Sequence, residues 1–129
     1  MKILKNQKGQ AMVEFALILP ILLLLVMGIA EFGMMFNSYL SVQNATREGA
    51  RIGIVGATDL EIEERILNTS PSLRKERIAI TIEPGNDGRI SGETLRVLVN
   101  YDYQMVVPFI SIIFGGSVNL SGESSMRIE

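Results

Sequence analysis

The stretch that decides the fold is "KGQAMVEFALILP", Lys8 to Pro20, where a basic residue and a glycine precede a glutamate and a long apolar run. From Phe15 to Ala30 the run has no charged residue. As a helix these residues would be about 24 Å long, which is short of the roughly 30 Å hydrocarbon core of a bilayer. A membrane span therefore has to include a neighbouring acid, and Glu14 lies directly before the run.

Two extensions of the run would make it long enough to cross a membrane. Extension to Gln10 gives about 31 Å and places Glu14 about 6 Å inside the hydrocarbon boundary. Extension to Met35 would place Glu31 in the membrane instead. We favour the first, because basic residues then lie at the cytoplasmic interface, as the positive-inside rule requires.

Charge is distributed unevenly along the chain. Lys2, Lys5 and Lys8 precede Gly9 without any acid, whereas the whole chain has a net charge of −2. This predicts a single-pass protein of the inner (cytoplasmic) membrane, with a cytoplasmic N-terminus and an extracytoplasmic domain after about Phe36. The acidic balance of that domain argues against nucleic acid as a partner.

Composition also limits the chemistry that the chain can carry. It has no cysteine and no histidine, which excludes disulfides, thiol catalysis and the usual zinc sites. No glycine-rich phosphate loop follows a strand, and the acids lack the spacing of a metal-binding loop. We therefore expect no enzyme, no cofactor, no metal and no small-molecule substrate.

Glu14 has three interpretations. It can reach the headgroups and be inert, or it can be neutralised by a partner, since acids within membrane spans are generally functional. In the third, residues 1–30 are an export signal, because Gly28-x-Ala30 is a small-x-small pattern before Glu31. That alternative would release a soluble binding domain, but an acid beside the apolar run and the early Pro20 fit it poorly.

The residues around Glu14 resemble a prepilin leader. Glu14 is the fifth residue after Gly9, and an aromatic residue, Phe15, follows it. This pattern is similar to the Flp branch of type IV pilins (tight-adherence, type IVc pili). The resemblance implies that a prepilin peptidase cuts between Gly9 and Gln10, removing residues 1–9 and leaving the span in place.

Such a cut would create a positively charged partner for Glu14. The new amine at Gln10 lies four residues away, about 6 Å along a helix. A neighbouring subunit shifted by about that distance would bring its amine beside this carboxylate, and the pair would select the register of assembly. The inert interpretation of Glu14 stays open beside this one.

Two further segments resemble the TadE-like family of minor pilins. "ATREGARIG", residues 45–53, is similar to the segment that follows the span, and the closing "SMRIE" is similar to the end of such chains. The resemblance implies a structural subunit of a tight-adherence pilus whose partners are the peptidase and other pilin subunits. A secretion-system pseudopilin is the alternative within this class.

The predicted fold is α+β and pilin-like. A long helix, kinked near Pro20, continues to about Ile52, so that residues 10–56 form the span and its extension. Gly49 and Gly53 are four residues apart, a spacing that permits close helix packing. A capping box, Thr58-x-x-Glu61, predicts a short helix from Asp59 to Asn68 whose inward side chains are Leu60, Ile66 and Leu67.

Residues 57–129 form the predicted extracytoplasmic domain. Apolar residues alternate with polar ones over three segments, which predicts an antiparallel sheet of about three strands. The inward positions are Ile78, Ile80 and Ile82, then Leu95 to Met105 at every second residue, then Val118 to Ile128 at every second residue. We expect the helices that follow the membrane to cover the apolar face of this sheet.

Between the last two strands lies an uncharged segment, "VVPFISIIFGG", Val106 to Gly116. It is either part of the core or an exposed apolar patch that meets the outer leaflet or a neighbouring pilin.

Overall fold

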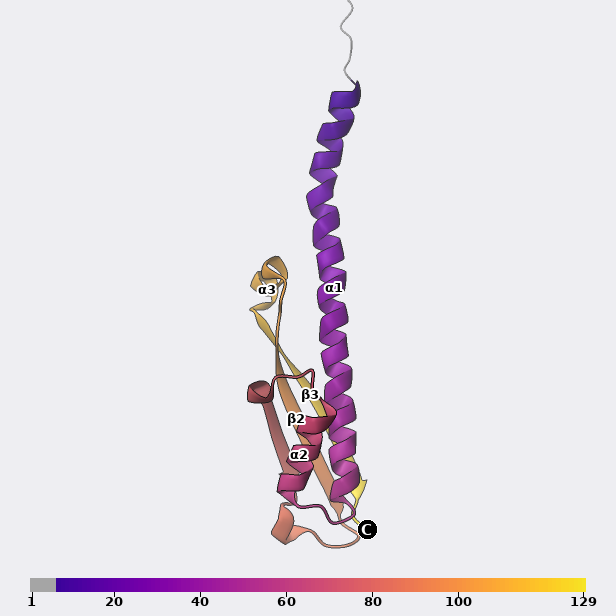
Figure 1. The fold of residues 1–129 in the computed structure, drawn as a ribbon, viewed down its shortest axis with the longest axis vertical. Coiled ribbons are helices and arrows are strands. Elements are labelled where there is room, and N and C mark those ends of the chain that lie inside the picture. Colours follow the sequence, from indigo (N-terminus) through magenta and orange to yellow (C-terminus); the bar gives the residue numbers. More distant parts are fainter. Residues whose placement is uncertain (1–6) are drawn as a thin grey trace, which may run out of the picture.

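The computed structural model describes residues 7–129, and its elements confirm the α+β class. Figure 1 shows a long helix beside a small domain. The elements in chain order are α1 (Gln7–Gly53), α2 (Asp59–Thr69), β1 (Ile78–Glu83), β2 (Thr94–Gln104), α3 (Pro108–Phe114) and β3 (Ser117–Arg127), with short 3₁₀ turns at Lys75–Arg77 and Asn86–Gly88. Lys2 and Lys5, and with them most of the predicted leader, lie outside the described residues.

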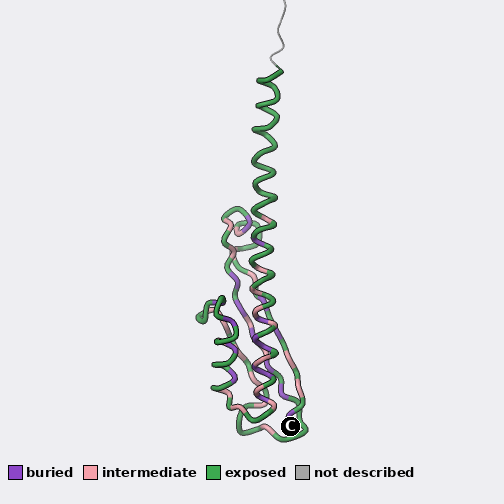
Figure 2. Tube along the Cα trace, turned by 45° about the vertical axis from the view of Figure 1, so that its right-hand side comes forward, coloured by how far each residue is buried: buried purple, intermediate pink, exposed green. Residues whose placement is uncertain are grey.

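Helix α1 has two parts with different surroundings. Residues 7–27 are exposed, and the helix extends well past the domain, whereas the buried positions gather toward its C-terminal half (Figure 2). This helix is long and apolar enough to cross a membrane. It continues through Pro20 without a break, and the kink expected there stays a prediction.

The sheet has the order β1-β2-β3, and both strand pairs are antiparallel. The predicted alternation is confirmed, because the inward side chains of the central strand are buried and their neighbours mostly are not. The buried residues of β2 are Leu95, Val97, Val99, Tyr101 and Tyr103. With one buried residue at every second position, the sheet has one face that requires a cover.

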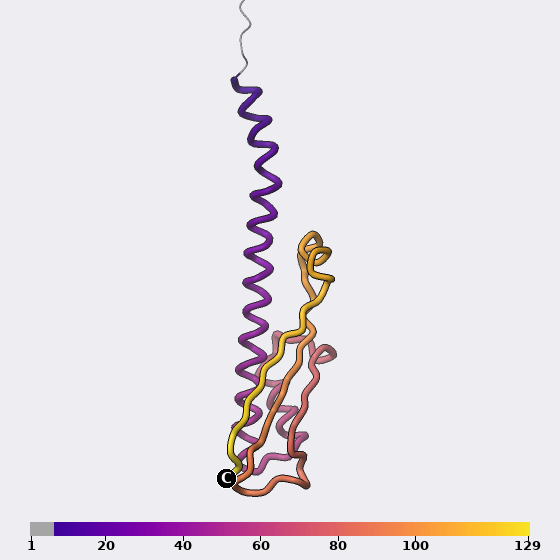
Figure 3. Tube along the Cα trace, turned by 180° about the vertical axis from the view of Figure 1, so that it is seen from behind, coloured from indigo at the N-terminus to yellow at the C-terminus, as the bar shows by residue number. Residues whose placement is uncertain are grey.

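The C-terminal half of α1 provides that cover. Figure 3 shows β3 running beside this half of the helix, and Val42, Ala45 and Ala50 of α1 belong to the same buried core as the strands. Gly122 of β3 lies so close to α1 that an added Cβ would be 2.7 Å from the hydroxyl oxygen of Thr46. The absence of a side chain at Gly122 therefore lets helix and strand approach closely.

Helix α2 begins at the predicted capping box. The Glu61 amide donates to Thr58 Oγ1 at 3.3 Å, and the Thr58 amide donates to Glu61 Oε2 at 2.7 Å. The inward residues are Ile62 and Ile66, which share one face of the helix because they are four residues apart. The prediction for Leu60 was wrong: it lies nearly opposite Ile62 around the helix and is 74% exposed. Leu67 is only partly buried.

The segment from Val106 to Gly116 forms α3 and its two flanking turns. Gly115 and Gly116 adopt positive φ angles of 78° and 87°, a conformation that glycine accepts without strain, and they turn the chain back into β3. Ile110 is buried, but the other large side chains of α3 are exposed. The core interpretation of this segment is therefore wrong for most of its residues, and the exposed-patch interpretation fits them.

Candidate functional sites at Glu14 and Glu31 of helix α1

The structure places Glu14 on the exposed apolar part of α1. Its Oε1 accepts a hydrogen bond of 3.1 Å from the side-chain amide of Gln10, and Phe15 next to it is 62% exposed. Gly9 and Gln10, the predicted cut site, are exposed residues in the first turns of the helix. Gln10 and Glu14 thus lie on one face of α1, one turn apart.

This arrangement leaves the Glu14 carboxylate with a neutral partner only, among the residues that the structure describes. An ionised side chain near the centre of an inserted helix costs on the order of 2.5–3.5 kcal/mol, and less toward an interface. If α1 is inserted in a membrane, a positive group beside Glu14 would be attracted more strongly than beside an acid in water. The reason is that the attraction between opposite charges increases as the dielectric constant falls.

A second acid, Glu31, lies further along the same helix and is almost completely buried, with 1% exposure. The hydroxyl of Tyr103 donates to Glu31 Oε1 at 2.8 Å, and the backbone amide of Val107 donates to Oε2 at 2.7 Å. The amide of Val106 lies 3.1 Å from both oxygens. We call these four residues the Glu31 clamp.

The clamp joins three elements. Glu31 belongs to α1, Tyr103 lies on the inward face of β2, and the two amides belong to the link that leads from β2 into α3. Burial, and then the hydrogen bond to Glu31, raise the pKa of Tyr103 to about 12, so that its hydroxyl keeps its proton and can donate. The clamp therefore fixes both the sheet and the start of α3 against the middle of α1.

The sequence pointed to Glu14 and gave no prominence to Glu31. In the sequence Glu31 stood out only as the acid that ends the uncharged run and as the residue after the alternative export cut. The donors lie 72 to 76 residues away along the chain, so no local spacing relates them to Glu31.

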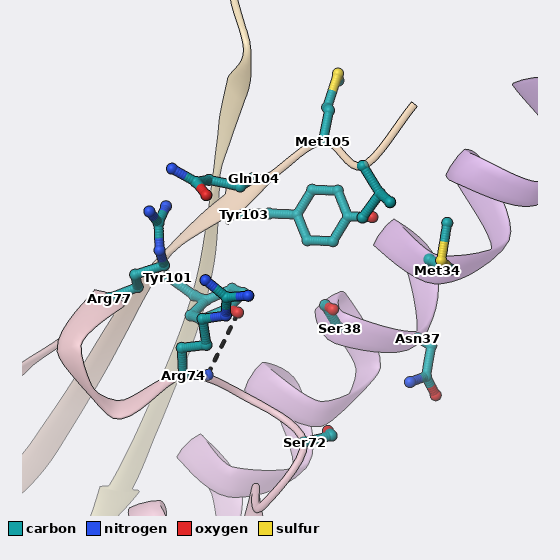
Figure 4. A pocket seen from close by; sticks show the side chains of 11 residues that line it. Met34, Asn37, Ser38, Ser72, Arg74, Arg77, Tyr101, Tyr103, Gln104 and Met105 are labelled. Carbon is teal, nitrogen blue, oxygen red and sulfur yellow. Dashed lines mark hydrogen bonds between the residues drawn. The ribbon is translucent and has the colours of Figure 1, made fainter. Parts of the chain in front are cut away.

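A cleft of about 450 Å³ lies beside the clamp, between α1 and the sheet. Figure 4 shows the Tyr103 ring pointing toward α1, and the backbone amide of Arg74 donating to the Tyr101 hydroxyl at 3.4 Å. Arg77 pairs with Asp102 at 3.2 Å. Within residues 7–129, no buried side-chain polar atom lacks a partner and no cluster of potential metal ligands occurs.

The remaining predicted residues serve the domain itself. Gly49 and Gly53 face α2 inside the chain, where an added Cβ at Gly49 would lie 2.6 Å from Ile66. Glu48 pairs with Arg51 at 2.6 Å and with Arg65 at 3.5 Å, so the charged side chains of this part of α1 pair locally.

Comparison with known families found a match to most of α1. Residues 9–51 match the family model described as "TadE-like protein", and the matched segment includes the predicted cut site, both glutamates and the apolar run. The resemblance to TadE-like proteins is thereby confirmed for residues 9–51, and the family suggests a pilin-like protein associated with tight-adherence pili. No curated protein and no solved structure matches the chain.

Proposed function

We propose that this chain is a minor pilin or pseudopilin that serves the assembly of a tight-adherence (Flp, type IVc) pilus. The observation that carries the proposal is the position of Glu14: an acid on an exposed apolar helix, one turn from Gln10, inside the segment that matches the TadE-like family. Prepilin peptidase cuts between Gly9 and Gln10, and the new amine of a neighbouring subunit then pairs with Glu14.

The pairing follows from the geometry of the helix. The hydrogen bond between Gln10 and Glu14 places their side chains on one face, about 6 Å apart along the axis. A neighbouring pilin displaced by one helical turn presents its amine at the level of this carboxylate. The ammonium replaces a neutral amide as the partner of Glu14, and other registers leave two charges unpaired in an apolar environment.

The shape of the molecule suits this role. Residues 15–27 of α1 are exposed and carry no charge, so this part of the helix can lie in lipid before assembly and pack against other pilin helices afterwards. The folded domain sits at the opposite end, where it stays outside the membrane when the N-terminus is cytoplasmic. Lys8 at the start of α1, with Lys2 and Lys5 before it, favours that orientation.

The structure disfavours the alternative of a soluble exported domain cut before Glu31. The Ala30–Glu31 bond lies in the middle of a continuous helix, and the Glu31 carboxylate is held by the clamp. The Gly9–Gln10 bond, by contrast, lies within one turn of the helix end at Gln7.

The test is the N-terminus of the protein isolated from its native membrane, read by mass spectrometry of the N-terminal peptide. A chain that begins at Gln10 supports the proposal, and this method also detects a cyclised glutamine. A chain that begins at Glu31 would indicate the exported domain, and one that keeps Met1 would indicate a plain membrane anchor. Either result would overturn the pilin assignment.

A substitution at the cut site makes the test specific. Gly9→Leu places a bulky side chain at the position where the backbone must approach the peptidase, and it is expected to leave the chain uncut. Gly33→Leu is the matched control, because Gly33 lies on the same helix with no atom within 4 Å of an added Cβ. Normal trimming of Gly9→Leu would rule out this cut site.

A further inference from the structure

Helix α3 presents an uncharged, mostly apolar surface to its surroundings. Phe109, Ile112, Ile113 and Phe114 are between 52% and 79% exposed. No residue from Val106 to Gly116 carries a charge. Four large apolar side chains on two turns of helix form a patch that water alone would not favour.

Contacts fix the level of α3 along α1. An added Cβ on Gly28 would lie 3.7 Å from Ile110, and the rings of Phe32 and Phe114 meet edge to face with centroids 6.4 Å apart. Phe109 reaches further toward the N-terminus of α1, where it lines an apolar cavity of about 340 Å³ with Pro20 and Met27. Figures 1 and 3 show α3 projecting from the end of the sheet beside the middle of α1.

This level coincides with the end of the predicted span. If residues 10–30 of α1 cross the membrane, then Leu24, which faces α3, lies about 9 Å inside the boundary at Ala30. Amphipathic elements that lie in the membrane interface bury their apolar face about 5–10 Å deep. Because α3 packs beside Leu24, it would lie at about the depth of such an interfacial element.

Backbone groups on both sides of α3 are hydrogen-bonded within the protein, which favours contact with lipid. The amides of Val106 and Val107 donate to Glu31 before the helix begins. On the other side, the amide of Gly116 donates to the Ser111 carbonyl at 2.7 Å, and the Ser111 hydroxyl donates to the Pro108 carbonyl at 2.7 Å. The Glu31 clamp thus provides an acceptor for the amides of Val106 and Val107, directly before the chain enters the apolar helix α3.

We infer that α3 is a second membrane contact of this protein and that its exposed face lies among the acyl chains of the leaflet next to the domain. Lipid fits better than a protein partner, because the patch continues directly onto the exposed apolar residues Leu24, Leu25 and Ile29 of α1. A protein-docking surface usually has a polar rim, and no charged residue borders this one along Val106–Gly116. The inference rests on the proposed insertion of α1.

Single-cysteine labelling of the full chain tests the inference, because the protein has no cysteine of its own. Ile113→Cys and Ile112→Cys report on α3, Ile18→Cys reports on the exposed apolar part of α1, and Val55→Cys reports on the far end of the domain. All four positions are at least 60% exposed. Each variant carries an environment-sensitive fluorophore in vesicles of phosphatidylethanolamine and phosphatidylglycerol.

The expected result is that nitroxide-labelled acyl chains quench the α3 labels as they quench Ile18→Cys, whereas aqueous iodide quenches only Val55→Cys. If the α3 labels behave like Val55→Cys while Ile18→Cys is quenched by lipid, the inference is overturned and the span stands. If Ile18→Cys is not quenched by lipid, the proposed anchoring itself fails. Shielding of α3 that appears only at high protein-to-lipid ratio would show that another copy of the chain occupies the patch, which also overturns the inference.

Discussion

The hydroxyl of Tyr103 lies 2.8 Å from Oε1 of Glu31, so that a side chain of the central strand is bonded to the middle of α1. C-terminal to Glu31, α1 packs on the sheet, whereas N-terminal to Glu31 it is mostly exposed and, within residues 7–129, meets only α3. The Glu31 clamp therefore marks where the contact between α1 and the sheet ends. In the proposed pilin it also determines how far the domain stands from the membrane.

Glu31→Ala is expected to destabilise the domain strongly. It leaves the Tyr103 hydroxyl and the amides of Val106 and Val107 without an acceptor, and each buried unsatisfied group costs about 1–3 kcal/mol. We expect the free energy of unfolding in detergent to fall by about 3 kcal/mol, measured by urea titration. Glu14→Ala is the matched control, because its acid lies on the exposed part of the same helix. Equal stability of the two variants would contradict a structural role for the clamp.

The Tyr103 hydroxyl is expected to ionise at a higher pH than an ordinary tyrosine. Burial and the bond to Glu31 raise its pKa from 10 to about 12. Because the pKa is higher in the folded state, the stabilisation is complete below pH 10 and is lost as the pH rises through about 12. With three tyrosines and no tryptophan, near-ultraviolet absorbance resolves the titration, and Tyr103→Phe identifies the late component. Glu31→Gln should lower the pKa of this component, and an unchanged pKa would exclude the coupling.

Local patterns predicted the elements of this fold because they have local causes. The capping box at Thr58 and Glu61 consists of neighbours in sequence, and its two hydrogen bonds are present as expected. Period-two alternation likewise marked the inward residues of β2. The inward face of α2 was only partly correct, because which side of a short helix is buried depends on where it packs, here against Gly49 and Gly53.

The Gly122 position should tolerate no side chain without a shift of β3 away from α1. An added Cβ would meet Thr46 Oγ1 at 2.7 Å, and it would lie 3.3 Å from the backbone carbonyl oxygen of Val42, which is less able to move. We expect Gly122→Ala to destabilise by about 1–3 kcal/mol, as overpacked cores do, measured by thermal unfolding. Gly33→Ala is the control: nothing lies near its added methyl group, and the gain in helix propensity should stabilise slightly. Similar effects of the two substitutions would contradict the close approach at Gly122.

The two glutamates show where inference from sequence ends. Glu14 could be singled out because its presumed determinants, Gly9 and Gln10, lie within five residues. The partners of Glu31 reach it only because the end of β2 and the link to α3 pack against the middle of α1. Local sequence also did not decide between core and exposed patch for Val106–Gly116. In the fold this segment extends beyond the sheet, so that most of its large side chains are exposed beside α1.

Glu14→Gln is expected to separate processing from assembly. The amide keeps the shape of the side chain and can still bond to Gln10, but it lacks the charge that attracts the amine of a neighbouring subunit. The variant should be cut at Gly9 as the native chain is, yet be lost from the sheared pilus fraction or from complexes cross-linked to other pilins. Met12→Ala, which removes an exposed apolar side chain from the same turn of α1, should leave both steps intact. Assembly of Glu14→Gln at the native level would show that the acid is inert and only tolerated at the membrane boundary. Loss of both cutting and assembly would instead assign Glu14 to peptidase recognition.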